Sequence, residues 1–314
     1  MPTYYVDSAG SNTAPYDTWA KAAQDPNTIE AILAAGDIMY CRGTFNGTWT
    51  FGASGTNTTT GIISRIGCDA AGTPYAGQYI VERGGGGVKA INVNTKSYWF
   101  LSNVTGQNAT QENFGGTAAY VLLNKCYSNS AGRYGFNILS AGVNYQNCYA
   151  LSSTNIGFFL QVNQRAVGCL SLNGSAGGFY LAGDCVCAHC VAANNADDNY
   201  LLAGATNWVL NSVAHGSTGG SGIKFNAVNL YNFVFGCALT SNNQYGLEAP
   251  AGNFTGFEDY NGFLNNGVAD RTNVPTGPNS GTFTALPYVN VAGGNFTTSD
   301  TADFRRTEID MEFA

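Results

Sequence analysis

The hydrophobic positions in the central part of the chain follow a short phrase that returns about every 22 residues. In most copies a cysteine precedes a short β-type run, and a glycine followed by an apolar-x-apolar triplet comes later in the same copy. The first phrase gives one equivalent position per copy: Cys126, Cys148, Cys169, Cys190, Ser212 and Cys237. The second phrase gives another: Phe136, Phe158, Phe179, Tyr200, Ile223 and Leu247. Two phrases with one shared period indicate a structural repeat.

The repeating unit is too short for a helical hairpin, and it has no apolar stripe of helical period. Its short β-type runs, separated by Gly, Asn and Ser, are typical of one coil of a solenoid. A coil has no core of its own and must stack on its neighbours, which sets equivalent residues about 4.8 Å apart. The pattern therefore predicts an all-β, single-stranded parallel β-helix with the two repeated positions as inward ladders. The general crossover preference predicts a right-handed one.

The same pattern predicts a single domain over residues 1–314. Its expected parts are a strand and cap helix over 1–36, coils over 37–264, and closing coils with a tail over 265–314. The cap helix is expected between residues 17 and 35, divided at Pro26, where it would cover the open end of the first coil. Residues 107–118, rich in Gln, Asn, Thr and Gly, are expected to leave the coil as a loop. The tail over 304–313 is open between an end cap, an attachment segment and a solvated terminus.

Composition narrows the function classes. Charged residues make up 11% of the chain and hydrophobic residues 44%, with 41 glycines, which describes a folded, turn-rich β protein rather than a disordered one. A net charge of −7 argues against nucleic acid or an anionic membrane as a partner. The same charge would repel a polyanionic glycan unless a metal ion or a local basic patch intervened. No apolar run approaches the length of a membrane span.

The nine cysteines do not resemble a disulfide framework, because most of them fall on the repeat, where each would be a small buried hydrophobe. An odd number of such thiols fits a reducing compartment, and Met1 leads directly into the first predicted strand without a signal peptide. The stretch from Cys185 to Cys190 contains His189 and resembles a zinc-binding sequence. Since Cys187 and Cys190 both fall on predicted inward columns, we interpret them as buried thiols and expect no metal site.

Three stretches of the first 70 residues give a resemblance to a known superfamily. They are Tyr-Tyr-Val at 4–6, Gly-Asp-Ile-Met-Tyr-Cys-Arg-Gly-Thr-Phe at 36–45, and Gly-Ile-Ile-Ser-Arg-Ile-Gly at 61–67. With the closing stretches 258–263 and 286–290, they resemble the pectate-lyase-like right-handed β-helix superfamily over most of the chain. That superfamily includes lyases, hydrolases, esterases and non-catalytic virion proteins, so the resemblance implies a scaffold and not an activity. Its lyases carry particular Asp and Arg or Lys sets on the first sheet, and no stretch here matches one.

In each apolar-x-apolar triplet the middle side chain should point outward, because side chains alternate along a strand. The resulting outward column is Asn137, Phe159, Tyr180, Leu201, Lys224 and Glu248. Three successive members, Phe159, Tyr180 and Leu201, are large and apolar at a position that should face solvent. Three interpretations remain open: a loop of the same chain covers them, another subunit contacts them as in a threefold bundle of solenoids, or they bind sugar rings.

The next two members of the column, Lys224 and Glu248, lie one coil apart, and Asp197 and Asp198 fall in the turn before the neighbouring strand. The ordinary interpretation is a surface ion pair beside a solvated acidic turn. The functional interpretation is a set of paired carboxylates of the kind that hydrolyses glycosidic bonds. A lyase would instead use Lys224 or Arg133 as the base, with carboxylates holding Ca²⁺ against a uronate. Outside that alternative no cofactor is expected.

Two function classes follow from these observations. The first is a non-catalytic or weakly glycan-binding virion surface protein of a phage, made in the host cytoplasm, such as a head decoration, head fibre or tailspike component. It would form a homotrimer or attach to other virion proteins. The alternative is a polysaccharide lyase or glycoside hydrolase that acts on the outward face of the first sheet. A stable trimer without action on any glycan favours the first, and a monomer that depolymerises a polysaccharide favours the second.

Overall fold

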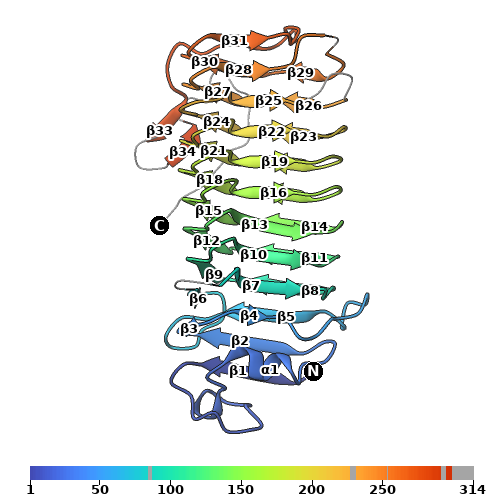
Figure 1. Ribbon diagram of the computed structural model, residues 1–314, viewed down its shortest axis with the longest axis vertical. Coiled ribbons are helices and arrows are strands. Elements are labelled where there is room, and N and C mark those ends of the chain that lie inside the picture. The colour runs from blue at the N-terminus through green and yellow to red at the C-terminus, as the bar shows by residue number, and fades with distance from the viewer. Residues whose placement is uncertain (84–86, 227–230, 253, 291–294, 299–314) are drawn as a thin grey trace.

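The computed structural model describes residues 1–83, 87–226, 231–252, 254–290 and 295–298. Across them the chain winds into a tall right-handed parallel β-helix of roughly eleven coils with very little helix (Figure 1). The fold class expected from the repeat is confirmed. The division into three segments stays a prediction, and the tail over 304–313 lies outside the described residues.

In the described residues, three parallel sheets of eleven, eleven and ten strands run along the solenoid, so nearly every coil contributes one strand to each. Sheet A contains β1 (Thr3–Asp7), β2 (Ile38–Arg42), β5 (Ile63–Gly67), β8 (Trp99–Ser102), β11 (Val121–Asn124), β14 (Val143–Gln146), β17 (Arg165–Val167), β20 (Val186–Ala188), β23 (Trp208–Leu210), β26 (Phe233–Phe235) and β29 (Phe257–Asp259). Sheet B contains β3 (Thr44–Asn46), β6 (Tyr79–Glu82), β9 (Val104–Gln107), β12 (Tyr127–Asn129), β15 (Tyr149–Leu151), β18 (Leu170–Leu172), β21 (Val191–Ala193), β24 (Val213–His215), β27 (Ala238–Thr240), β30 (Gly262–Leu264) and β32 (Gly281–Thr282). Sheet C contains β4 (Trp49–Thr50), β7 (Lys89–Asn94), β10 (Glu112–Thr117), β13 (Tyr134–Leu139), β16 (Phe158–Leu160), β19 (Phe179–Leu181), β22 (Tyr200–Leu202), β25 (Ile223–Phe225), β28 (Tyr245–Glu248) and β31 (Ala269–Thr272). A separate antiparallel pair joins β33 (Tyr288–Asn290) and β34 (Asn295–Thr298).

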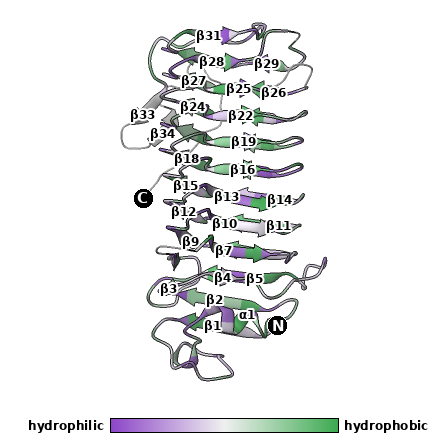
Figure 2. Ribbon diagram, viewed as in Figure 1, coloured by the Kyte–Doolittle hydropathy of each residue, from purple (hydrophilic) through white to green (hydrophobic). Residues whose placement is uncertain are grey.

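The register between coils places equivalent residues directly above one another. In sheet C, Phe136 pairs with Phe158 and Phe158 with Phe179, and their rings stack with centroids 4.6 and 4.8 Å apart. In sheet B, Tyr127 pairs with Tyr149, which aligns the preceding Cys126 and Cys148. Both predicted inward ladders are therefore confirmed. Figure 2 shows the consequence, with hydrophobic strands such as β16 and β19 along the stack and a hydrophilic β31 at its C-terminal end.

The cysteines behave as the repeat predicts. All nine are buried free thiols. The Sγ atom of Cys148 lies 3.6 Å from the carbonyl oxygen of Leu123, and that of Cys190 lies 3.4 Å from the carbonyl oxygen of Ala166, in each case on a neighbouring coil. Burial raises the pKa of both thiols well above the ordinary value. These thiols are therefore weak donors inside the core rather than reactive or metal-binding groups.

A buried ion pair closes the N-terminal end of the core. Arg65 stands on the inward column between Met39 and Leu101, and its Nε lies 2.6 Å from Oε1 of Glu30, with both side chains almost fully buried. Trp49 Nε1 donates to the same carboxylate at 2.9 Å. Removing one partner of such a pair would leave an uncompensated charge in the core.

The cap helix is shorter than expected. The stretch between residues 17 and 35 contains only a 3₁₀ turn, η1 (Trp19–Lys21), and one short helix, α1 (Pro26–Glu30). Pro26 does not divide a helix but begins one, because the missing N–H of proline has no cost at the first helical position. Ala23 instead forms a bridge to Val6 of β1. No helix in the described part of the chain combines the length and hydrophobicity that crossing a bilayer requires.

The loop expected over residues 107–118 is also wrong. This stretch contains β10, which pairs with β7 on one side and β13 on the other. Phe114 continues the aromatic ladder, stacked on Phe136 with centroids 4.5 Å apart. The many Asn, Gln, Thr and Gly residues hid the single inward aromatic residue that sets the register. The correction matters because it places Glu112 on the outer face of sheet C.

Candidate functional site

The outer face of sheet C carries one continuous outward column, and the strand register defines its members. They are Thr50, Asn92, Gly115, Asn137, Phe159, Tyr180, Leu201, Lys224, Glu248 and Thr272. Along the column, polar residues of the first coils give way to an apolar middle part and then to charged residues. The column therefore joins three chemically different regions on one straight line.

The middle of the column is an apolar ridge formed by Phe159, Tyr180 and Leu201. The Phe159 and Tyr180 rings are stacked with centroids 4.4 Å apart and planes 7° apart, and all three side chains are half-buried. Because the rings stack along the solenoid, each ring covers a face of its neighbour and turns an edge to solvent. The ridge is therefore not covered completely by loops of this chain, and it offers apolar edges rather than an open ring face.

Next to the ridge lies a charged cluster, which we define as Asp198, Lys224 and Glu248 together with Ser221. Lys224 Nζ lies 3.3 Å from Glu248 Oε1 and 3.9 Å from Asp198 Oδ2. Ser221 joins the two carboxylates, since its N–H donates to Asp198 Oδ1 at 2.8 Å and its hydroxyl donates to Glu248 Oε2 at 2.6 Å. Each member of the cluster thus has a partner within it.

Burial and charge act in opposite directions in this cluster. Burial of the Asp198 carboxyl raises its pKa to about 6, although the Ser221 N–H and the Lys224 ammonium favour the charged form. For Lys224, burial lowers the pKa, but the carboxylates of Asp198 and Glu248 outweigh it and the net shift is upward. Asp198 therefore exchanges a proton in mildly acidic solution while Lys224 stays charged.

The structure does not bring all of the sequence-predicted candidates together. Asp197 is exposed beside the cluster and affects it through its charge. Arg133 lies over the ring of Tyr134 at 4.6 Å, at the start of β13. From there the Lys224 strand is four strands away along sheet C, roughly 19 Å at the usual strand spacing. Lys224 and Arg133 are thus too far apart to act on one sugar bond.

No group of three or more His, Cys, Asp or Glu side chains in the described residues is arranged to hold a metal ion. In the stretch that resembles a zinc site, the Sγ atom of Cys185 lies 2.8 Å from the carbonyl oxygen of Gln161. His215 is buried with Nδ1 2.8 Å from the hydroxyl of Thr240, and burial lowers its pKa. The polar groups of Cys185 and His215 therefore have partners within the stack of coils.

Sequence reasoning missed an exposed apolar strip on sheet A, formed by Val186, Trp208, Phe233 and Phe257. These residues are aligned by register, and the Trp208 and Phe233 rings stack with centroids 3.9 Å apart. Trp208 is 37% and Phe257 46% exposed. The signal was present, because the strands Trp-Val-Leu and Phe-Val-Phe are apolar at inward and outward positions alike, which is typical of strands covered on both faces.

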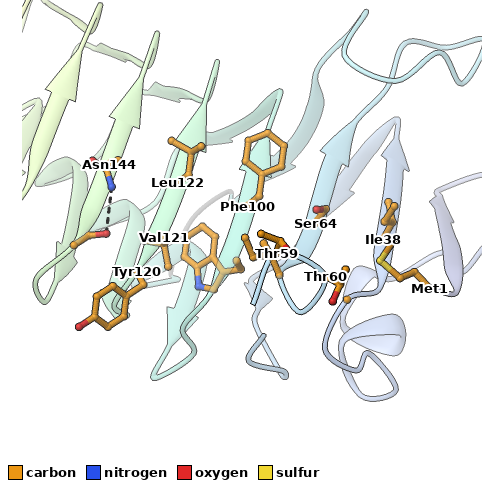
Figure 3. A pocket seen from close by; sticks show the side chains of 14 residues that line it. Met1, Ile38, Thr59, Thr60, Ser64, Phe100, Tyr120, Val121, Leu122 and Asn144 are labelled. Atoms are coloured by element: carbon orange, nitrogen blue, oxygen red, sulfur yellow. Dashed lines mark hydrogen bonds between the residues drawn. The ribbon is translucent and has the colours of Figure 1, made fainter. Parts of the chain in front are cut away.

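An open groove of about 660 Å³ lies at the N-terminal end of sheet A, on its outer side. Figure 3 shows Phe100 and Leu122 on neighbouring strands in this groove, with Tyr120 at the edge and Asn144 beyond them. No Asp, Glu, His, Lys or Arg side chain of the described residues lines it, so the groove has no carboxylate or imidazole for acid–base chemistry. The charged cluster on sheet C is the better candidate for a functional site.

Comparison with solved protein structures finds other proteins of the same fold. No family model matches the chain, and no curated protein matches it. Among solved structures, pectate lyase Pel9A is similar over 93% of this chain and 84% of its own, with a TM-score of 0.66 and 16% identity. An alginate lyase from Paenibacillus sp. str. FPU-7 is similar over 82% of this chain and 94% of its own (TM-score 0.58, 13% identity).

A third similar structure is the tailspike protein gp49 of Acinetobacter baumannii bacteriophage Fri1, a capsular polysaccharide depolymerase. The likeness covers 86% of this chain and 55% of that one, with a TM-score of 0.58 and 12% identity. At these identities the comparisons show a shared right-handed parallel β-helix and nothing about activity. The resemblance noted in the sequence is thereby confirmed for the fold.

Proposed function

We propose that this protein binds a polysaccharide along the outer face of sheet C and does not cleave it. The observation that carries this proposal is the single column in which the apolar ridge meets the charged cluster. Apolar edges of Phe159 and Tyr180 would contact the carbon–hydrogen faces of sugars, and Lys224 and Glu248 would contact hydroxyl groups. Binding without cleavage agrees with a cluster whose charged groups already satisfy one another.

The setting that we propose is the surface of a phage virion, as the composition and the cysteine usage suggest. In support, the tailspike protein gp49 of bacteriophage Fri1 has the same scaffold. In immuno-electron microscopy, antibodies raised against the purified protein should label the surface of phage particles. Labelling confined to host cells would contradict this setting.

Affinity electrophoresis through gels that contain single polysaccharides tests the binding. We expect at least one polysaccharide to retard the protein, and we expect Tyr180→Ala to weaken that retardation about tenfold, the loss of roughly 1.4 kcal/mol. The matched control is Tyr149→Ala, because Tyr149 forms the same kind of stack with Tyr127, at 4.5 Å, on sheet B. Equal losses in both variants would contradict a site on sheet C.

A second function, cleavage of the polysaccharide, is favoured by Asp198. A carboxyl whose pKa is about 6 is suited to donate a proton to a leaving oxygen, and Glu248 is the second carboxylate of the cluster. A hydrolase would release reducing ends, whereas a lyase would release unsaturated sugars with ultraviolet absorbance and would be expected to lose activity when Ca²⁺ is chelated. Either product, abolished in Asp198→Asn, would replace binding alone as the function.

The oligomer expected from the sequence stays a proposal, and we place its contact on the sheet A strip rather than on the ridge of sheet C. The strip carries no charge in a chain of net charge −7, and it lacks polar groups for sugar hydroxyls. Another copy of this solenoid presents side chains at the same spacing along its axis, so the two surfaces would interdigitate over several coils. Light scattering should give an oligomer for the wild type and a monomer for Trp208→Lys.

A further inference from the structure

Glu112 is an acidic residue on sheet C whose side chain is 6% exposed. A Cβ atom added to Gly115 would lie 2.9 Å from the Cβ atom of Glu112 and 3.1 Å from its Oε2 atom. Since Gly115 belongs to the outward column, the Glu112 carboxylate lies on the outer side of the sheet, in the space that a side chain at residue 115 would occupy. The glycine creates that space.

The hydrogen bonds of this carboxylate are incomplete. Glu112 Oε1 accepts one long hydrogen bond, at 3.4 Å, from Asn137 Nδ2. Glu112 Oε2 and Asn137 Oδ1 are both buried without a hydrogen-bond partner. Two adjacent acceptors without a donor are unfavourable in a folded protein, and they mark a place where a missing donor would be bound.

The charges around Glu112 do not supply that donor. In the strand register Glu112 stands between Lys89 of β7 and Tyr134 of β13, and Arg133 lies over the Tyr134 ring. No ion pair within 4.0 Å joins Glu112 to a cation in the described part of the chain. Asn137 is followed in the outward column by Phe159, so the two acceptors adjoin the apolar ridge at the end opposite the charged cluster.

We propose that Glu112 and Asn137 form a subsite for a neutral sugar residue, whose hydroxyl groups donate to Glu112 Oε2 and Asn137 Oδ1. This inference rests on the proposed polysaccharide binding and specifies its ligand. A hydroxyl group can donate a hydrogen bond to a carboxylate oxygen and to an amide oxygen. A uronate would instead place a second carboxylate beside Glu112, and the two negative charges would repel. Glu112 Oε2 and Asn137 Oδ1 are both closed to water in the free protein. Entry of the sugar therefore requires a rotation of the Glu112 side chain.

The subsite also sets the length of the ligand. From the Glu112 strand, β10, to the Glu248 strand, β28, sheet C has six strand intervals, roughly 29 Å at the usual spacing. The apolar ridge fills the middle of that distance. The face thus fits an extended chain of several sugars, neutral at the Glu112 end, rather than a single monosaccharide.

The experiment measures retardation in gels that contain dextran, galactan or mannan, and in gels that contain alginate or polygalacturonate. We expect a neutral polysaccharide to retard the wild type and both polyuronates to leave it unretarded. Glu112→Gln should weaken the neutral binding about tenfold or more, because the sugar hydroxyl loses a charged acceptor, and Asn137→Ala should weaken it about fivefold, because a neutral acceptor is lost. Glu82→Gln is the control, since Glu82 lies on sheet B, where it accepts from Asn108 Nδ2 at 2.7 Å.

Different outcomes separate the two proposals. Retardation by no polysaccharide contradicts the proposed function itself. Neutral binding that is lost in Tyr180→Ala but unchanged in both subsite variants overturns only the subsite. Two findings on the free protein would also overturn it: a ¹³C shift of a protonated Glu112 carboxyl at pH 7, which would satisfy both oxygens with a shared proton, or thermal stabilisation by Ca²⁺ that disappears in Glu112→Gln.

Discussion

The outer face of sheet C holds two acidic groups in contrasting surroundings. In the charged cluster, Lys224 stands between Asp198 and Glu248 and lies within 4 Å of both carboxylates. About five coils earlier, Glu112 has no such cation in the described residues, and its neighbour in space is Gly115. Both groups occupy the same sheet of the same repeat. The comparison teaches that the residues one coil above and below decide whether a carboxylate in a solenoid is neutralised or left open.

The largest expected effect is the pH dependence of folding stability that Asp198 of the charged cluster produces. The folded pKa of Asp198, about 6, is above its ordinary value of 3.8, so the folded state holds this proton more tightly than the unfolded state. Its contribution to stability is present below pH 3.8 and is lost as pH rises to 6, by at most about 3 kcal/mol. Thermal unfolding temperatures of the wild type and of Asp198→Asn should therefore diverge between about pH 4 and 6, with the wild type losing stability relative to the variant. A constant difference across that range would show that Asp198 is not perturbed.

Removing the cation would make the charged cluster resemble the open site. Lys224→Met leaves Asp198 and Glu248 without their shared ammonium group. We expect a loss of about 2 kcal/mol at pH 7, below the value for a fully buried pair because Lys224 is one third exposed. Chemical denaturation measures the loss, and Lys89→Met is the control on the same face. An equal effect of the two substitutions would mean that packing of the lysine stem, and not its charge, matters.

A substitution that fills the space beside Glu112 tests whether Gly115 creates the room for this carboxylate. Gly115→Ala brings a methyl group 2.9 Å from the Cβ atom of Glu112, so one of them must move, at a cost of about 1–2 kcal/mol. The double variant Gly115→Ala with Glu112→Ala should recover most of that loss, because the two residues share the space. Additive losses in denaturant unfolding would place the strain elsewhere.

The smallest effect is a gain. Glu112→Gln replaces an unpartnered carboxylate oxygen with an amide donor that can reach Asn137 Oδ1. We expect unfolding to cost about 1 kcal/mol more than in the wild type, the usual net value of one hydrogen bond. Thermal unfolding at pH 7 measures it, with Glu82→Gln as the control. If the variant were less stable than the wild type, the Glu112 carboxylate would have a stabilising partner that the amide loses.

The sequence by itself determined the architecture, because two apolar phrases share one period of about 22 residues and no stripe of helical period accompanies them. The cysteine and phenylalanine positions had to be inward, and the outward order Phe159, Tyr180, Leu201, Lys224 and Glu248 followed from side-chain alternation. The repeat failed where its signal was weakest. In residues 107–118 a single inward Phe114 set the register among polar neighbours, and near the N-terminus Pro26 began a short helix instead of dividing a long one.

Only the tertiary structure decided how these positions interact. That Ser221 joins Asp198 to Glu248, that Arg133 is remote from Lys224, and that Glu112 fills the space left by Gly115 depend on distances between coils. A periodic pattern specifies which side of the sheet a residue faces, but not how a side chain bends over its neighbours. Burial and hydrogen bonding at that scale, of a few ångströms, set the charge and the open acceptors on which binding depends.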